Sequence, residues 1–130
     1  MADKKWYASP VVGGIVGIFA GGLTILVIES LGHALLGTAD PAVPSSITTP
    51  MFLSVLIAWI TGSFVAGSVA TAWARARSVG PGVIAGIVLL AAAAWNMFVM
   101  PHPVWLVLSA LLLMPAAAFA ASRLRLARST

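Results

Sequence analysis

The chain has 130 residues, of which 61% are hydrophobic and only 8% are charged. A soluble domain carries about 25% charged residues, so this composition excludes an ordinary soluble protein. It predicts one integral membrane domain over residues 1–130. The net charge of +4 does not indicate nucleic-acid binding, because the basic residues lie at the ends of apolar segments. Cysteine is absent, which excludes a disulfide framework and a thiolate site.

Four apolar segments follow one another along the chain. A hydrocarbon core about 30 Å thick needs about 20 helical residues, and each segment is long enough. The fold class we expect is all-α, an integral membrane bundle of four transmembrane helices, with spans at about residues 11–36, 51–73, 82–100 and 104–122. The first segment follows Pro10, which suits the first turn of a helix, and it is too long for a cleaved signal peptide. The fourth contains Pro115, which predicts a kink.

The basic residues define a topology. All seven lie in the N-terminus, the second connection or the C-terminal tail: Lys4, Lys5, Arg75, Arg77, Arg123, Arg125 and Arg128. With four spans these three segments share one side of the membrane, and the positive-inside rule makes that side cytoplasmic. We therefore expect a multi-pass protein of the bacterial inner (cytoplasmic) membrane with both termini in the cytoplasm. The tail arginines are few, which favours topology signals over lipid-binding sites.

One acidic residue, Glu29, lies inside an apolar segment. Placing a charged group at the centre of a membrane helix costs roughly 2.5–3.5 kcal/mol, so such a residue usually has a use or a partner. His33 follows four residues later, which places both side chains on one helical face. We therefore expect the functional site of the protein to include this pair.

Further polar residues fall at the same membrane face as this pair. His102 lies between Pro101 and Pro103 in the third connection. The predicted topology also brings three supporting residues to the outer half: Asn96, Asp40 and Ser54. These groups, far apart in the sequence, are predicted to share the periplasmic end of the bundle.

Three interpretations of Glu29, His33 and His102 remain open. They could ligate a divalent metal such as zinc, for which imidazole and carboxylate are suitable ligands. Copper is a less favoured variant, suggested by the outer-half thioethers of Met51, Met97 and Met100. The Glu–His pair could instead bind or relay protons, as ionisable groups in transporters do. Finally, Glu29 could be a structural acid that hydrogen-bonds helices together.

Small residues recur at intervals of four, a spacing that lets membrane helices approach closely. The clearest sets are Gly13, Gly17 and Gly21 in the first segment, and Gly62, Ala66 and Ala70 in the second. We interpret most of them as packing within one bundle, with a face for another subunit as the alternative. Trp59 and Trp95 are interpreted as packing residues within spans. No nucleotide-binding loop, nucleophile elbow or HExxH motif is present, and we do not expect an enzyme.

Two short segments carry a resemblance: Ile28-Glu29-Ser30-Leu31-Gly32-His33 and, far downstream, Pro101-His102-Pro103-Val104-Trp105. The pattern E-S-x-G-H followed by P-H-P-x-W resembles an uncharacterised family of small four-span bacterial inner-membrane proteins. The resemblance implies the same fold and supports the choice of site residues, but it implies no activity.

The sequence thus predicts a membrane protein with a cation- or proton-binding site formed by Glu29, His33 and His102 in the periplasmic half, serving transport. Four short spans leave little room for a private pathway, so transport implies a homo-oligomer. The alternative is an accessory subunit of a larger membrane complex that packs through its small-residue faces. In both cases the lipid bilayer is the surrounding partner and nucleic acid is not.

Overall fold

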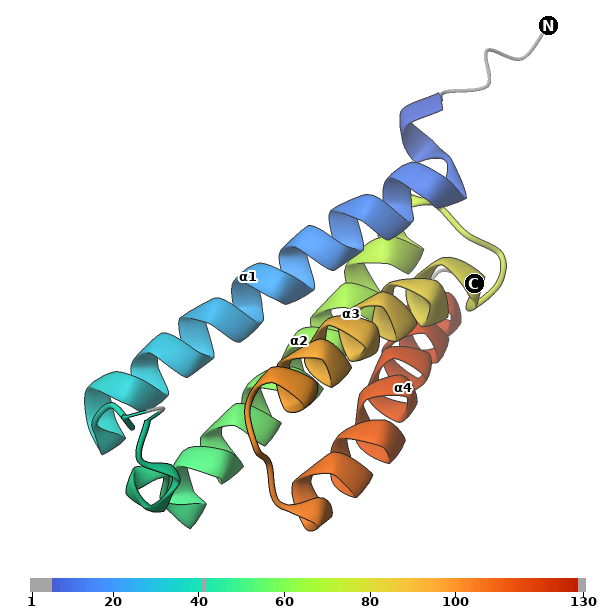
Figure 1. Ribbon diagram of the computed structural model, residues 1–130. Coiled ribbons are helices and arrows are strands. Elements are labelled where there is room, and N and C mark those ends of the chain that lie inside the picture. The colour runs from blue at the N-terminus through green and yellow to red at the C-terminus, as the bar shows by residue number, and fades with distance from the viewer. Residues whose placement is uncertain (1–5, 41, 129–130) are drawn as a thin grey trace, which may run out of the picture.

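A computed structural model describes residues 6–40 and 42–128, so the predicted basic residues Lys4 and Lys5 lie outside the described part. Four long helices make up the fold (Figure 1), and they are α1 (Pro10–Leu36), α2 (Thr49–Trp73), α3 (Gly80–Val99) and α4 (Val104–Ala127). Two short 3-10 turns, η1 (Trp6–Ala8) and η2 (Pro44–Ser46), precede α1 and α2.

Each of these helices is long and apolar enough to cross a membrane, which confirms the all-helical, multi-pass prediction. Pro10 lies in the first turn of α1, as predicted. Ser9 caps this helix, because its hydroxyl accepts a hydrogen bond from the Val12 N–H at 3.2 Å. The helix α4 runs continuously through Pro115 and continues to Ala127, beyond the expected end of the span at residue 122. Arginine side chains are compatible with this extension, because their stems pack on apolar surface while their charges reach water.

The interior of the bundle is built from small side chains. Fully buried positions include Ala58, Ala66, Ala85, Ala110 and Ala118, and larger buried side chains such as Leu106 and Met114 are few. Large apolar side chains point outward instead, and Phe19, Leu35, Phe98 and Leu112 are all more than 70% exposed. An apolar exterior around a small-residue interior suits a bundle surrounded by lipid, where close van der Waals packing holds the helices together.

The tightest helix contact joins α1 to α2. A Cβ atom added at Gly17 would lie 2.6 Å from the Ala66 carbonyl oxygen and 2.6 Å from the Ala70 Cβ, and Gly13 and Gly21 meet α2 just as closely. Only glycine permits this separation of the two backbones. The glycine spacing of the first segment is therefore used for packing within the bundle.

Helix α2 lies at the centre of the bundle, since it packs against α1, α3 and α4. The antiparallel course of the helices brings the α1–α2 and α3–α4 connections to one end, and η1, the α2–α3 connection and the end of α4 to the other (Figure 1). A hydrogen bond from the Trp73 indole N–H to the Tyr7 carbonyl oxygen, 2.8 Å long, ties η1 to the end of α2.

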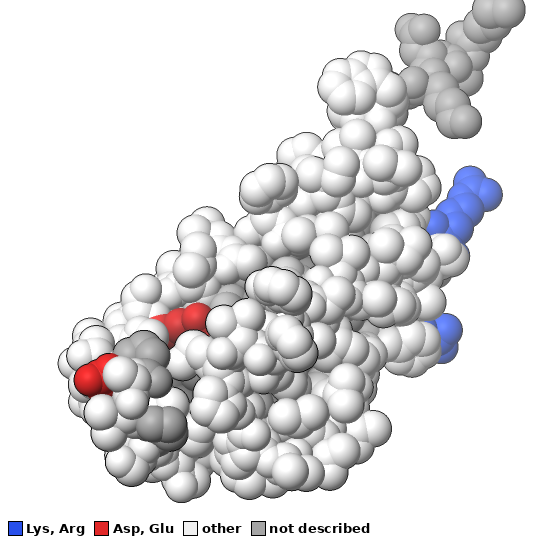
Figure 2. Space-filling model, viewed as in Figure 1, with Lys and Arg blue, Asp and Glu red and all other residues white. Residues whose placement is uncertain are grey.

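Charge separates along the long axis of the molecule. On the face that Figure 2 shows, the acidic side chains of the described residues lie near one end and arginines project from the other, with uncharged surface between them. We call the first the acidic end, with Glu29 and Asp40, and the second the basic end, with Arg75, Arg77, Arg123, Arg125 and Arg128.

Candidate functional site

Glu29 lies on α1 about two turns before the helix ends, and its side chain is partly buried. One carboxyl oxygen, Oε1, accepts a hydrogen bond of 2.9 Å from the indole N–H of Trp59 on α2. Trp59 is only 3% exposed, so its N–H has no access to water and needs an acceptor within the protein. The close approach of α1 and α2 thus lets the acid satisfy the indole, and the carboxyl faces a neighbouring helix rather than lipid.

A pocket of about 150 Å³ opens beside this hydrogen bond at the acidic end. Four polar side chains line it, contributed by α1, α3 and the α3–α4 connection: Glu29, His33, Asn96 and His102. The rest of the lining is mainly apolar, with Phe52, Val55 and the thioethers of Met51 and Met100. The pocket therefore combines a few polar groups with apolar walls, as small-ligand and ion sites do.

His102 reaches the pocket because the α3–α4 connection is short and holds it between two prolines. Its Nδ1 lies 2.7 Å from the carbonyl oxygen of Met100. A carbonyl oxygen can only accept, so this nitrogen carries the proton and Nε2 of the neutral ring is left as the acceptor. The ring also lies against aromatic neighbours, 5.7 Å from the Phe52 ring and 5.9 Å from the Trp59 ring between centroids.

His33 lies one helical turn beyond Glu29 on α1 and is exposed at the rim of the pocket. Both imidazoles are close enough to the Glu29 carboxyl to interact with it electrostatically. The i, i+4 spacing accounts for the first interaction, and the position of His102 beside Trp59 accounts for the second. All three residues that the sequence singled out thus line one pocket.

Of the three supporting residues, the fold brings only Asn96 to the pocket. The Asp40 carboxyl accepts from the Ala42 N–H at 2.9 Å and so stabilises the first connection. Ser54 donates to the Met51 carbonyl oxygen at 3.0 Å and lies against Gly32, between α1 and α2. Asp40 and Ser54 therefore have local structural contacts away from the pocket lining.

The arrangement does not fit a preformed zinc centre. Within residues 6–40 and 42–128, no three His, Cys, Asp or Glu side chains are grouped closely enough to hold a metal ion. A tetrahedral zinc site needs at least three such ligands. In addition, the Trp59 N–H already occupies one oxygen of Glu29.

Trp59 packs in the buried core, as the sequence predicts, but its hydrogen bond to Glu29 is not among the sequence predictions. The signal that could have found it is chemical: an indole N–H deep in an apolar helix needs an acceptor, and Glu29 is the one acid in any apolar segment. Trp95, by contrast, is 68% exposed and faces outward beside Phe98.

No family model, curated protein or solved structure matches this chain.

Proposed function

We propose that the protein is an inner-membrane protein that takes up a proton at Glu29, from the periplasmic side, and exchanges it with His33 and His102. The observation that carries this proposal is the 2.9 Å hydrogen bond from Trp59 to a carboxyl group on a membrane-spanning helix, beside a pocket that both imidazoles line. An ionisable group that faces a bundle interior, and not lipid, is typical of proton relays.

Each group has a stated part in this proposal. The Trp59 N–H holds one oxygen of Glu29 in both protonation states, which leaves Oε2 to receive or release the proton. His102 has its Nδ1 fixed by the Met100 carbonyl, so Nε2 is the nitrogen that exchanges the proton. His33, exposed at the rim, connects the pocket with the solution. Coupling of this proton to transport of a substrate would need an oligomer, because one bundle of four spans offers little room for a second pathway.

The alternative function, an accessory subunit of a larger membrane complex, has less support. The small-residue faces that would receive a partner are occupied within the bundle: Gly13, Gly17 and Gly21 pack on α2, and Gly67 and Gly86 pack on α4. What α1 exposes is a row of large apolar side chains, such as Ile15, Phe19 and Leu23, which lipid covers equally well.

Infrared spectroscopy of the purified protein in lipid, titrated with pH, tests the proposal. We expect a carboxylic acid band that forms as the pH falls and that is lost in Glu29→Gln, because the band reports protonation of this carboxyl. Asp40→Asn is the matched control, since it removes an exposed acid whose carboxyl contact is within the first connection. Its spectrum should retain the Glu29 band.

Metal analysis of the same preparations tests the alternative, which is a metal site at the same residues. Stoichiometric zinc or copper that is lost in both Glu29→Gln and His33→Ala would replace the proton site with a metal site. Retention of the titrating band in Glu29→Gln would also contradict the proposal, because the carboxyl that titrates would then be another one.

A further inference from the structure

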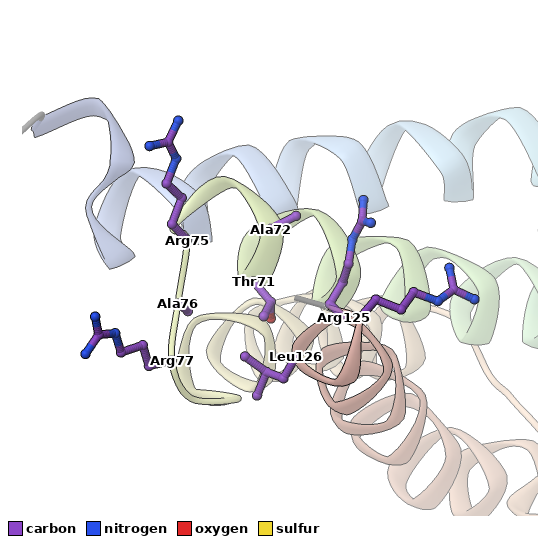
Figure 3. Close-up of a pocket in the computed structure, with 8 residues that line it drawn as sticks. Thr71, Ala72, Arg75, Ala76, Arg77, Arg125 and Leu126 are labelled. Atoms are coloured by element: carbon purple, nitrogen blue, oxygen red, sulfur yellow. The ribbon is translucent and has the colours of Figure 1, made fainter. Parts of the chain in front are cut away.

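Arginines from two distant parts of the sequence meet at the basic end. Arg75 and Arg77 belong to the α2–α3 connection, and Arg125 and Arg128 belong to the end of α4. All four line one cavity of about 470 Å³ (Figure 3). The extension of α4 to Ala127 creates this arrangement, because it carries the tail arginines alongside the connection. Four like charges around one cavity indicate a site for an anion.

In Figure 3 the side chains of Arg75, Arg77 and Arg125 extend in different directions from the α2–α3 connection and the end of α4, and Thr71 lies on α2 between them. The Thr71 hydroxyl is buried and has no hydrogen-bond partner among the residues that the structure describes. Every basic residue after residue 5 is arginine, the side chain whose planar fork binds phosphate oxygens in pairs.

The backbone at Arg75 is unusual. Helix α2 ends in a Schellman motif, in which the Ala76 N–H bonds the Thr71 carbonyl oxygen at 3.2 Å and the Arg75 N–H bonds the Ala72 carbonyl oxygen at 3.1 Å. Arg75 takes the left-handed position of this motif, with φ of 45°, where glycine is usual. Glycine would be less strained there, so an arginine at this position points to a use for its side chain.

An apolar groove of about 550 Å³ adjoins the arginine cavity, and Ala76 and Arg77 line both. Its walls come from the first turns of α1, with Val11, Ile15 and Ile18, and from the start of α3, with Pro81 and Ile84. From Val11 to Ile18 the groove follows α1 for about 10 Å. A site for a free phosphate ion has no need of an apolar extension, whereas a phospholipid has a charged head group joined to acyl chains.

We propose that the basic end binds an anionic phospholipid, with the phosphate in the arginine-lined cavity and one acyl chain lying in the groove between α1 and α3. Basic pockets between membrane helices are suited to anionic head groups. This site is independent of the proton site, because it lies at the opposite end of the bundle (Figure 2). The tail arginines would then bind lipid as well as set the topology.

Native mass spectrometry of the full-length protein, titrated with phosphatidylglycerol or phosphatidylcholine, tests this inference. Wild type should bind phosphatidylglycerol with a clear preference, and Arg125→Gln should weaken that binding about tenfold, the usual worth of a charge-assisted hydrogen bond. Arg123→Gln is the matched control, because it removes the same charge from the same helix but lines neither the cavity nor the groove. It should change binding by a factor of about three at most.

Two glycine variants of α1 test whether the groove holds an acyl chain. A Cβ atom at Gly14 or at Gly22 would meet nothing within 4 Å, so both positions accept a larger side chain without a clash at Cβ. Gly14 lines the groove, and Gly22 lies two turns further along α1. Gly14→Leu should therefore displace the acyl chain and weaken phosphatidylglycerol binding, whereas Gly22→Leu should not.

Two results would overturn the inference. Equal losses in Arg125→Gln and Arg123→Gln would mean that overall charge, and not this cavity, attracts the lipid. Displacement of phosphatidylglycerol by inorganic phosphate, together with no effect of Gly14→Leu, would assign the cavity to a soluble phosphate.

Discussion

At the residue scale, the molecule is distinguished by one side-chain contact between α1 and α2. The Glu29 carboxyl is the acceptor that the buried Trp59 indole requires, and Trp59 is the donor that a carboxyl at lipid depth requires. Their hydrogen bond lowers the free-energy cost of burying both polar groups. The rest of the acidic-end pocket, with His33, Asn96 and His102, is arranged next to this pair.

The contact should appear as a coupling energy between its two residues. In a double-mutant cycle with Trp59→Phe and Glu29→Leu, which removes the acceptor at similar size, we expect a coupling of about 0.5–2 kcal/mol in the free energy of unfolding, the range for hydrogen bonds between membrane helices. Reversible unfolding in mixed micelles measures it. Trp73→Phe is the control, because Trp73 donates to the Tyr7 carbonyl at the other end of the molecule. Additive effects of Trp59→Phe and Glu29→Leu would mean that the two side chains do not interact.

At the element scale, the site depends on how closely α1 approaches α2. Gly13, Gly17 and Gly21 allow the two backbones to touch, and this contact sets the distance from which Glu29 reaches Trp59. The connection between α3 and α4 has a similar role, since its two prolines and the Nδ1 hydrogen bond of His102 hold that ring at the pocket. The packing of small residues along α1 and α2 thus determines where the polar side chains of the same two helices meet.

Substitutions in the glycine row test this dependence. Gly17→Ala places a methyl group 2.6 Å from the Ala66 carbonyl oxygen, so it should force α1 away from α2 and destabilise the protein by about 1–3 kcal/mol. Gly22→Ala, on the same helix, meets nothing within 4 Å and should be neutral or stabilising by up to about 1 kcal/mol. Thermal unfolding in detergent compares the two variants. Equal stability of both would show that α1 does not pack through its glycine row.

At the scale of the whole molecule, the charged residues that the structure describes divide between two ends, with arginines at one and Glu29 and Asp40 at the other (Figure 2). His33 and His102 line the pocket at the acidic end. The number of spans and the positions of the basic residues predict that the basic end faces the cytoplasm. The proposed proton site then opens to the periplasm, and the proposed lipid site lies in the inner leaflet.

Cysteine labelling tests this orientation, and the absence of native cysteine makes each introduced thiol unambiguous. Ser45 lies in the first connection and Ser78 in the second, and both are exposed. Ser45→Cys should react with a membrane-impermeant maleimide in intact spheroplasts, and Ser78→Cys should react only after the membrane is opened. The reverse pattern would place the arginines outside and would move the proton site to the cytoplasmic face.

Much of this architecture follows from the sequence. The helices were predictable because apolar length and charge placement are local properties, and Glu29 and His33 were predictable because polar atoms in apolar segments are costly. His102 followed from the predicted topology, which brings the third connection to the same end as this pair. The hydrogen bond from Trp59 to Glu29 was not predicted, because the spans are apolar all round and their pattern does not show which faces meet. The arginine cavity was not predicted either, since it depends on the turn at Arg75 and on the extension of α4.

The central claim is that a titrating carboxyl of Glu29 is bound by the indole of Trp59. The most direct measurement is the indole ¹⁵N–¹H resonance of Trp59, assigned by Trp59→Phe and followed by NMR across a pH titration. We predict that this resonance moves with pH in the wild type, because its acceptor gains a proton, and that it stays fixed in Glu29→Gln. A Trp59 resonance that ignores pH in the wild type, or that moves equally in Glu29→Gln, would contradict the account.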